Sequence, residues 1–294
     1  MKRVLLTGFS GFLGAFILDV LENEKYKVIK VGRNKISEIK IDLSLDTFPK
    51  VNVDYVVHVA GKAHVIPKTN EEKEEFFNVN YRGTVNLLDG LDLGKLKTII
   101  FISTVAVYGK EKGDLIDEKT PLNGNSPYAL SKIKAEQTII EFGIKNNIKT
   151  VILRLPLITG QSAPGNLNSI VNAIQKGYYF RIGKGTAKKS LIAASDVANL
   201  IPELFNLNGV YNVTDIKDPM ICEIDGIIAK KFNKKIITIP EILFKIFAKI
   251  GDMFYFLPFN SSKFNKLTKT LTFSNKKIFN KIKYRPSRGL NEII

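Results

Sequence analysis

The chain has 294 residues, 45% of them apolar, and carries 44 basic against 28 acidic side chains, a net charge of +16 at pH 7. That length and apolar content are sufficient for a large hydrophobic core, built as one large domain or as two lobes. The single cysteine excludes an internal disulfide, and with only two histidines in the chain a zinc site made by the protein alone is not expected.

Three glycines follow the first predicted strand, which covers residues 2–6. In TGFSGFLG, Gly8 allows a tight turn, Gly11 lets a pyrophosphate approach the main chain, and Gly14 lets the strand and the next helix pack closely. That helix, expected over 12–21, would offer its N-terminus to the phosphates. An ordinary glycine-rich turn is the alternative. A second strand, YKVIKVGR, follows within the length of one βαβ unit and favours dinucleotide binding.

Strand and helix patterns alternate along the next part of the chain. Buried strands are predicted at 54–61, 97–104 and 149–156, with helices between them at 70–91 and 126–146. This alternation predicts an α/β fold, a Rossmann-type doubly wound parallel sheet. From about residue 166 the pattern loosens, without a linker or a repeat. We therefore expect a dinucleotide-binding lobe with the catalytic residues over 1–165, and a smaller C-terminal α/β lobe for the substrate over 166–294, partly interleaved with the first.

The pair Tyr128 and Lys132 in SPYALSK is the strongest candidate for chemistry. Four residues apart on a helix, the two side chains share one face, so the ammonium can hold the phenol in place. We expect this cation, together with a bound nicotinamide, to lower the pKa of Tyr128 and make it a general base. A chance surface pair is the alternative, but this pair opens a helix announced by Ser126, behind the strand that ends at Thr104. The Thr104 hydroxyl would share the proton route.

Basic and apolar residues are concentrated in the last part of the sequence. Residues 231–294 hold 14 basic and 3 acidic side chains, a net charge of +11. A solvated lysine-rich surface is the simplest interpretation; a phosphate-bearing substrate and a membrane surface are the alternatives. Within this part, residues 240–259 predict a helix that is apolar on nearly every side and interrupted by Lys245, Lys249 and Asp252. It is either a packed core or dimer-interface helix, or a patch that lies against a membrane or a lipid-linked substrate.

The basic composition does not by itself indicate a nucleic-acid-binding protein. The lysines are not accompanied by a recognition helix, a zinc motif or a single-strand aromatic signature, so we expect no nucleic-acid partner. No apolar run is long enough to span a bilayer, and the first apolar stretch already serves as a strand. We therefore expect no cleavable leader and a cytoplasmic location, with peripheral membrane contact left open.

The motifs together resemble a known family. TGFSGFLG, VVHVAG, NVNYRGTVNLL, FISTVAVYG, YALSK and LRLPLITG occur in the order seen in the extended short-chain dehydrogenase/reductases of the NAD-dependent epimerase/dehydratase family, the group of the UDP-galactose 4-epimerases. The resemblance covers nearly the whole chain, and several ordered motifs are far more specific than any one of them. It implies an NAD(P)-dependent enzyme that acts on a nucleotide-diphosphate sugar, and a homodimer formed through the helices at 70–91 and 126–146.

The resemblance also implies roles for individual residues. It implies that Thr104, Tyr128 and Lys132 are catalytic and that Asn80 holds the active-site helix and its water network. The residues implied for cofactor binding are Gly8, Ser10, Gly11, Phe12, Leu13, Gly14, Arg33, Asp42, Leu43, Ala60, Gly61, Asn80, Tyr128 and Lys132. Those implied for substrate binding are Lys62, Thr104, Val105, Asn166 and Lys189. The family often has arginine near Lys189; a lysine keeps the charge but loses the bidentate grip on a diphosphate.

Two positions depart from the pattern of the family. NAD-specific members usually end the second strand with an acidic residue, where this chain has Arg33. An arginine there can accept a 2′-phosphate, which favours NADP; a solvent-facing arginine beside the adenine is the alternative. Dehydratases usually carry an Asp-Glu pair directly after the catalytic threonine, where this chain has Val105 and Ala106. Neither side chain can move a proton, so sugar 4,6-dehydration is not expected.

Three functions remain after this comparison. The leading hypothesis is a nucleotide-sugar 4-epimerase that keeps NAD bound and works through a 4-keto sugar. The closest alternative is an NADPH-dependent 4-ketoreductase, which Arg33 would favour. Either reaction could act on a sugar diphosphate attached to a membrane lipid, in polysaccharide biosynthesis. A non-catalytic dinucleotide-sensing subunit is the alternative from another class, and it would not need the complete set of Thr104, Tyr128 and Lys132.

Overall fold

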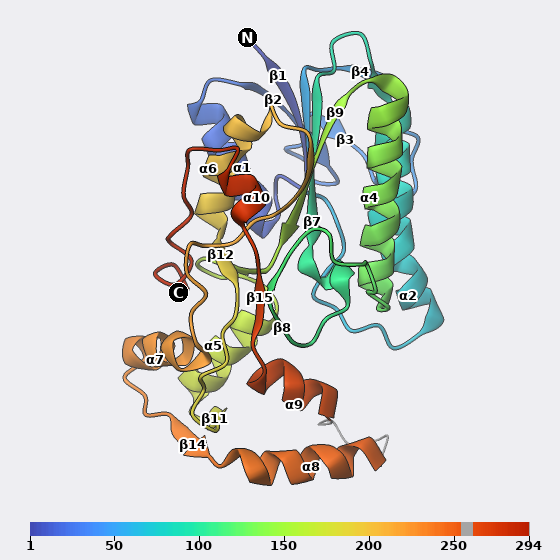
Figure 1. Cartoon of the computed structure of the whole chain (residues 1–294). Helices are drawn as coiled ribbons and strands as arrows, with labels where there is room; N and C mark the ends of the chain where they lie inside the picture. Colours follow the sequence, from blue (N-terminus) through green and yellow to red (C-terminus); the bar gives the residue numbers. More distant parts are fainter. Residues whose placement is uncertain (254–260, 294) are drawn as a thin grey trace.

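A parallel sheet of seven strands forms the middle layer of the computed structural model, which describes residues 1–253 and 261–293 (Figure 1). From one edge to the other the strands are β13 (Gly209–Asn212), β9 (Lys149–Leu155), β7 (Thr98–Thr104), β5 (Tyr55–His58), β1 (Arg3–Thr7), β2 (Lys27–Gly32) and β3 (Ile39–Lys40). Every pairing is parallel, and the order reverses at β1, as in a Rossmann sheet. The predicted fold class is confirmed.

Helices cover both faces of this sheet (Figure 1). One face carries α1 (Phe12–Asn23) and α6 (Ala194–Leu204), and the other carries α2 (Asn70–Phe77), α3 (Gly83–Asp89) and α4 (Pro127–Asn146). Each face has its own hydrophobic core, with Ile17 and Ile201 on the first and Leu87 and Ile139 on the second. The single helix predicted over 70–91 is interrupted: a π-helical turn, η1 (Asn78–Arg82), separates α2 from α3.

Small parallel ladders and short helices build the rest of the molecule. The ladders are β8 (Gly113–Ile116) with β15 (Leu271–Phe273), β10 (Leu157–Thr159) with β12 (Leu191–Ala193), β11 (Phe180–Ile182) with β14 (Ile237–Ile239), and β4 (Val51–Asn52) with β6 (Leu91–Asp92). The helices are η2 (Val105–Tyr108), a 3₁₀ turn, and α5 (Asn166–Lys176), α7 (Ile221–Lys231), α8 (Glu241–Met253), α9 (Ser261–Thr268) and α10 (Lys276–Phe279). The end of the molecule opposite the N-terminus is formed by β11, β14, α8 and α9 (Figure 1).

The two expected lobes share parts of the chain. Although β13 and α6 lie in the sequence range 166–294, β13 pairs with β9 in the large sheet and α6 packs against α1. The helix predicted over 240–259 is present as α8, and its last residues, 254–260, lie outside the described residues. Within the described ranges, the helices are too short or too polar to cross a membrane.

Candidate active site

The glycine loop joins β1 to α1. Gly8 has φ +70°, and a Cβ there would lie 2.6 Å from the Ala60 nitrogen; a Cβ on Gly14 would lie 2.0 Å from the Gly8 carbonyl oxygen. The turn and the contact between strand and helix therefore require these two glycines, as predicted. Gly11 is the N-cap residue of α1, and no side chain in the described residues caps this helix. Its first N–H groups form a cradle that suits an anionic pyrophosphate.

The side chains of the glycine loop differ in burial. Ser10 is exposed in the loop, and Phe12 and Leu13 form the first turn of α1. Phe9 is buried in the core, and the Phe12 ring lies so close to Gly160 that a Cβ there would meet it at 2.9 Å. The two phenylalanines thus hold the turn in place while its backbone stays open.

The loop after β5 approaches α4 at Gly61. Because β1 and β5 are parallel neighbours, their loops leave the sheet at the same edge, where ligands bind in such folds. A Cβ on Gly61 would lie 2.9 Å from Oδ1 of Asn80 and 3.7 Å from Nζ of Lys132. A glycine here therefore keeps the space beside the lysine clear, in the position expected for the cofactor's ribose.

Arg33 and Asp42 lie side by side where the adenine is expected. The Arg33 side chain is 81% exposed, and its Nη1 lies 3.5 Å from Oδ2 of Asp42. Hydrogen bonds from Ser44, with a smaller contribution from Arg33, hold the pKa of Asp42 below its ordinary value. Leu43 is half-buried, and its carbonyl accepts a hydrogen bond from Asn86 at 2.8 Å. The guanidinium faces solvent and is free to turn toward a 2′-phosphate.

Thr104, Tyr128 and Lys132 come together where β7 ends and α4 begins. Thr104 is the last residue of β7; its hydroxyl accepts the Ala106 N–H at 3.2 Å and lies near enough to the Tyr128 phenol to act on its pKa. Ser126 caps α4, as predicted, which places the phenol at the first turn of the helix. The strand end and the helix start therefore bring the predicted catalytic side chains to one place.

Lys132 lies one turn after Tyr128 on α4, and its side chain is buried. Its Nζ donates a hydrogen bond to the Ile102 carbonyl oxygen at 2.6 Å and lies 4.0 Å from the centre of the Phe101 ring. Burial lowers the pKa of Lys132 to about 7, and the charge of Glu136, one turn further along α4, opposes this shift. The lysine therefore titrates in the neutral range.

The expectation that Lys132 and a bound nicotinamide together lower the pKa of Tyr128 stays a prediction, and the lysine alone does not lower it. Burial raises the pKa of Tyr128 above its ordinary value, and the nearby Thr104 hydroxyl opposes the shift. The ammonium of Lys132 is directed to the backbone of β7 and not to the phenol. In the chain alone the phenol is therefore protonated at neutral pH, and a charge that ionises it has to arrive with the cofactor.

Asn80 joins the loop after β5 to α4. It is buried in the π-helical turn η1; its Oδ1 accepts the Lys62 N–H at 2.7 Å. Its Nδ2 donates to the Lys62 carbonyl and to the Ser131 hydroxyl, both at 3.0 Å. Since Ser131 belongs to α4, Asn80 occupies the position expected of a residue that holds the active-site helix. Such π turns are frequent at functional sites.

The sequence analysis missed a buried hydrogen-bond chain that ends at Asn80. The Thr7 hydroxyl accepts the two backbone N–H groups that follow His58, at 3.2 and 3.1 Å, so its own proton is donated to His58 Nδ1 at 2.7 Å. The proton of the neutral imidazole is then on Nε2, which donates to Thr84 at 2.9 Å, and Thr84 donates to the Asn80 carbonyl at 2.7 Å. Burial, together with Lys132, lowers the pKa of His58 to about 3. In the sequence, this hydrogen-bond chain could have been suspected from His58, which is a polar residue within the apolar run of a predicted strand.

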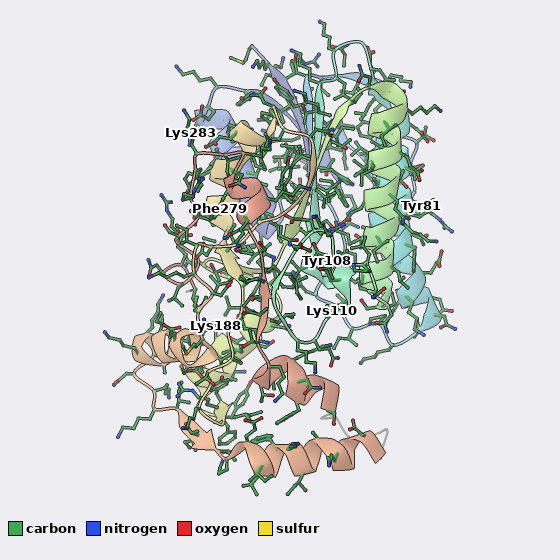
Figure 2. All side chains as sticks on the ribbon, viewed as in Figure 1. Tyr81, Tyr108, Lys110, Lys188, Phe279 and Lys283 are labelled. Atoms are coloured by element: carbon green, nitrogen blue, oxygen red, sulfur yellow. The ribbon has the colours of Figure 1, made fainter. Side chains whose placement is uncertain are left out.

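A second missed feature is a buried ion pair that anchors α4 to β9. Nη2 of Arg154 lies 2.7 Å from Oε2 of Glu136, and both side chains are almost fully buried. Nη1 of Arg154 donates to the Tyr108 hydroxyl at 3.0 Å, and Tyr108 donates to Asn212 at 2.7 Å. Tyr108, labelled in Figure 2, is the last residue of η2 and is fully buried. The network therefore joins α4, which carries the predicted catalytic pair, to β9, η2 and β13.

The predicted substrate residues have different surroundings. Lys62 follows Gly61 and Val105 follows Thr104, both predicted site residues, and Nζ of Lys62 lies 2.5 Å from Oε2 of Glu75. Asn166 is exposed at the start of α5. Lys189 donates to the carbonyl oxygens of residues 266 and 269, at 2.8 and 2.7 Å, and burial lowers its pKa to about 8. Its ammonium therefore holds the C-terminal end of α9 and does not lie free for a diphosphate.

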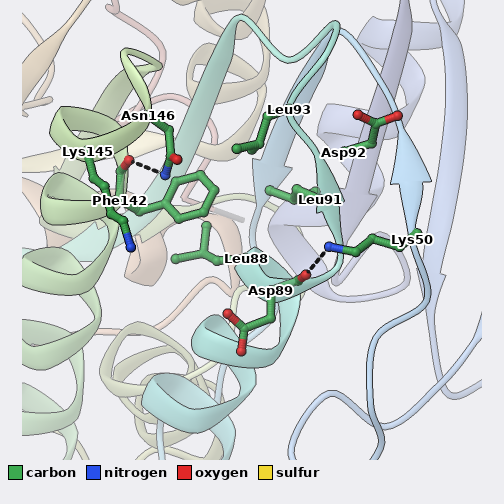
Figure 3. A pocket seen from close by; sticks show the side chains of 9 residues that line it. All are labelled: Lys50, Leu88, Asp89, Leu91, Asp92, Leu93, Phe142, Lys145 and Asn146. Atoms are coloured by element: carbon green, nitrogen blue, oxygen red, sulfur yellow. Dashed lines mark hydrogen bonds between the residues drawn. The ribbon is translucent and has the colours of Figure 1, made fainter.

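A surface hollow of about 510 Å³ lies away from these residues (Figure 3). It is formed by the last turns of α3 and α4 and by β6, whereas Tyr128 and Lys132 lie near the start of α4. Lys50 closes one side, with Nζ bonded to the Asp89 carbonyl at 2.8 Å. The hollow mixes aliphatic, acidic and basic side chains and contains none of the predicted site residues, so it is no part of the candidate site.

Comparison with known sequences identifies a family and relatives. The model of the NAD dependent epimerase/dehydratase family matches residues 4–213. A UDP-glucose 4-epimerase of Vibrio cholerae is 28% identical over 272 residues, which cover 85% of this chain and 82% of that protein. An N-acetyl-alpha-D-glucosaminyl-diphospho-ditrans,octacis-undecaprenol 4-epimerase of Escherichia coli O157:H7 is 27% identical over 255 residues, covering 80% of this chain and 73% of its own length.

Comparison with solved structures supports the fold. The structure of RMD from Pseudomonas aeruginosa complexed with NADPH matches with a TM-score of 0.73 and 20% identity, over 99% of this chain and 98% of the other. Because the match covers 99% of this chain, it includes residues 166–294 as well as the large sheet.

Proposed function

Because the chain belongs to the NAD dependent epimerase/dehydratase family, we propose that it is a sugar 4-epimerase whose catalytic residues are Thr104, Tyr128 and Lys132. The observation that carries the proposal is the junction of β7 and α4, where the phenol lies near the Thr104 hydroxyl and a buried lysine lies next to the open backbone of Gly61. This is the arrangement needed to take a proton from a sugar hydroxyl beside a dinucleotide.

The residues of the chain fit a dinucleotide. The glycine cradle at the start of α1 would hold the pyrophosphate, Gly61 leaves room for the ribose, and Asp42 lies where the adenine is expected. When bound, the nicotinamide supplies a hydride acceptor and donor for C4 of the sugar. The sugar itself would be bordered by Lys62 and Val105.

Each catalytic side chain has a distinct task in this proposal. Tyr128 removes the proton of the C4 hydroxyl as C4 is oxidised to a ketone, and returns a proton to O4 when the opposite face of C4 is reduced. Thr104 hydrogen-bonds to the phenol and steadies the reacting oxygen. Lys132, buried below, holds the ribose and supplies positive charge. Val105 and Ala106 offer no acid or base, which speaks against dehydration.

The proposal is tested by cofactor content and turnover. The protein is purified, denatured, and the released dinucleotide identified by mass spectrometry; conversion of UDP-glucose and UDP-N-acetylglucosamine is followed in the native protein. We expect retained NAD and interconversion at C4. Tyr128→Phe should lose at least about a thousandfold in turnover while retaining the cofactor. Tyr178→Phe is the matched control, because Tyr178 is exposed and lies outside both the candidate site and the proposed dimer contact.

A second candidate is a 4-ketoreductase, and the observation that favours it is Arg33. Its exposed guanidinium lies where a 2′-phosphate would be bound, which suits an enzyme that consumes NADPH and releases the oxidised cofactor. An empty site after purification, with tighter binding of NADPH than of NADH and no epimerisation, would favour the reductase. Tightly bound dinucleotide with neither activity would favour a sensing subunit.

The partners form the last part of the proposal. One relative is named for UDP-glucose and another for a diphospho-undecaprenol sugar, so the substrate is a sugar diphosphate carried either by a nucleotide or by a membrane lipid. We propose a cytoplasmic enzyme, with peripheral membrane contact in the second case. We also propose a homodimer through α2 and α4, where Leu130 is exposed and Lys134 covers the rings of Phe77 and Tyr81. Light scattering on the purified chain checks the dimer.

A further inference from the structure

The outer side of α8 exposes large apolar side chains. Ile242, Leu243 and Ile246 are 62%, 47% and 51% exposed. At about 100° per residue these positions fall within one sector of the helix. The opposite side packs against α9, where Ala248 of α8 and Phe264 of α9 are buried. The helix is therefore attached to the protein along one side and presents aliphatic side chains along the other.

Lysines border this exposed sector, and the acids of α8 are occupied. Lys245 and Lys249 are exposed, and none of the described carboxylates forms an ion pair with either. Glu241 pairs with Lys269 at 3.6 Å, and Asp252 accepts hydrogen bonds from the backbone N–H and the hydroxyl of Ser261. We call Ile242, Leu243, Lys245, Ile246 and Lys249 the α8 patch. Its apolar side chains are accompanied by unopposed positive charge.

The ladder next to α8 adds to the same end of the molecule. Residue 237 of β14 pairs with residue 180 of β11, so the side chains of Ile237 and Phe180, both exposed, are neighbours. The strand β14 leads directly into α8, and Figure 1 shows both at the end of the molecule, with no other element beyond them. Aliphatic and aromatic side chains next to lysines are the composition of helices that lie in the interface of a bilayer.

We propose that the α8 patch docks on the surface of an anionic lipid bilayer. The isoleucines and leucine would enter the boundary between headgroups and acyl chains, and the lysines would meet the anionic headgroups. Charge disfavours a second copy of the chain as the occupant, because each patch carries Lys245 and Lys249 without a paired carboxylate among the described residues, and two such patches repel each other. The proposed function includes peripheral membrane contact only for a lipid-linked substrate. This inference assigns the contact to α8, which contributes none of the proposed catalytic residues, and it holds for either carrier of the sugar.

The test is co-sedimentation of the full chain with vesicles of phosphatidylcholine, with and without phosphatidylglycerol. The protein should bind the anionic vesicles and be released by salt. Ile242→Ser/Ile246→Ser should reduce binding on the order of tenfold or more, because two aliphatic anchors are lost. Lys245→Gln/Lys249→Gln should reduce the preference for anionic vesicles by a similar factor.

Matched variants separate the patch from general surface properties. Leu93→Ser/Ile216→Ser removes two other exposed apolar side chains, and Lys27→Gln/Lys95→Gln removes the same charge elsewhere. Both should bind as the wild type does, and all variants should keep its melting temperature. The proposal is overturned if the wild type ignores anionic vesicles, if the α8 variants bind as it does, or if they change only its oligomeric state. None of these readouts requires turnover, so a failure of the proposed function would be seen separately.

Discussion

The Lys132 ammonium donates a hydrogen bond of 2.6 Å to the carbonyl oxygen of Ile102 and lies over the ring of Phe101, which belongs to the second hydrophobic core. Its pKa in the folded chain, about 7, lies below the ordinary value of 10.5. Between these values the unfolded chain binds more protons than the folded one, so this group makes stability rise with pH from about 7 to about 10.5.

Lys132→Met should abolish that dependence. Between about pH 6 and pH 10, the free energy of unfolding of the wild type should gain on that of the variant by a few kcal/mol, on the order set by the pKa difference. Urea unfolding of the cofactor-free proteins at both pH values measures it. Lys134→Met, on the exposed side of the same helix, is the control. If the free energies of unfolding of the wild type and of Lys132→Met change with pH in the same way, burial does not lower the pKa of this lysine.

The Thr104 hydroxyl lowers the pKa of Tyr128 against the effect of burial. Removing it in Thr104→Val should move the acid limb of the kcat profile to higher pH and reduce kcat at pH 7 by about 10- to 100-fold. Thr104→Ser keeps the hydroxyl and should restore both. A pH profile of Thr104→Val that coincides with that of the wild type would remove Thr104 from the proton route.

Gly14 faces the Gly8 carbonyl so closely that no side chain fits there. We expect Gly14→Ala to destabilise the chain by about 1–3 kcal/mol and to abolish dinucleotide binding, because α1 must move off β1. In Gly226→Ala, within α7, the new methyl meets nothing within 4 Å and should stabilise the chain by up to about 1 kcal/mol. Thermal unfolding and titration with NADH measure both variants, and equal behaviour of the two would contradict the close approach.

The ion pair between Glu136 and Arg154 is buried and also supports the charge of Lys132. Glu136→Gln leaves the guanidinium without its counter-charge and should cost about 3–5 kcal/mol. The exposed pair of Glu74 with Arg82 is the comparison, since Glu74→Gln should cost less than about 1 kcal/mol. Chemical denaturation measures both. A small loss for Glu136→Gln would mean that water reaches this network.

Arg33 should discriminate between the two dinucleotides whichever of them the enzyme uses. Arg33→Ala removes the exposed cation near the expected 2′-position and should weaken NADPH binding by about tenfold or more, leaving NADH nearly unchanged. Fluorescence titration with both cofactors measures the ratio, and Lys35→Ala controls for the loss of one positive charge nearby. An equal effect on NADH and NADPH would place the 2′-phosphate elsewhere.

The sequence was informative where the fold depends on neighbouring residues. Gly8 and Gly14 act within one turn of chain, and Ser126 announces a helix that begins at the next residue. The sheet follows from short apolar runs separated by helices, so β1, β2, β5, β7 and β9 were predicted to within a few residues, although β5 ends earlier, at His58. The edge strands β3 and β13 were not expected in this sheet.

The sequence was silent where partners lie far along the chain. The ring of His58 bonds residues 51 and 26 positions away, and Lys189 bonds the end of α9, 77 and 80 positions away. Neither pairing leaves a local pattern. The direction of the Lys132 ammonium is also set by packing against β7, and the raised pKa of Tyr128 is set by the burial of its phenol. The position of the Asn80 side chain could not be predicted for the same reason, because its partners Lys62 and Ser131 lie 18 and 51 residues away in the sequence.

The place of β13 at the edge of the large sheet bears on how the chain is synthesised. The outer edge of β9 emerges from the ribosome with its backbone groups unpaired, and its partner, residues 209–212, follows only after α5 and α6. A nascent chain that ends near residue 165 therefore carries an open, apolar edge strand, the kind of surface that pairs with other chains. Residues 209–212, from the C-terminal part of the chain, are therefore needed to cover the edge of the sheet that the first 165 residues form.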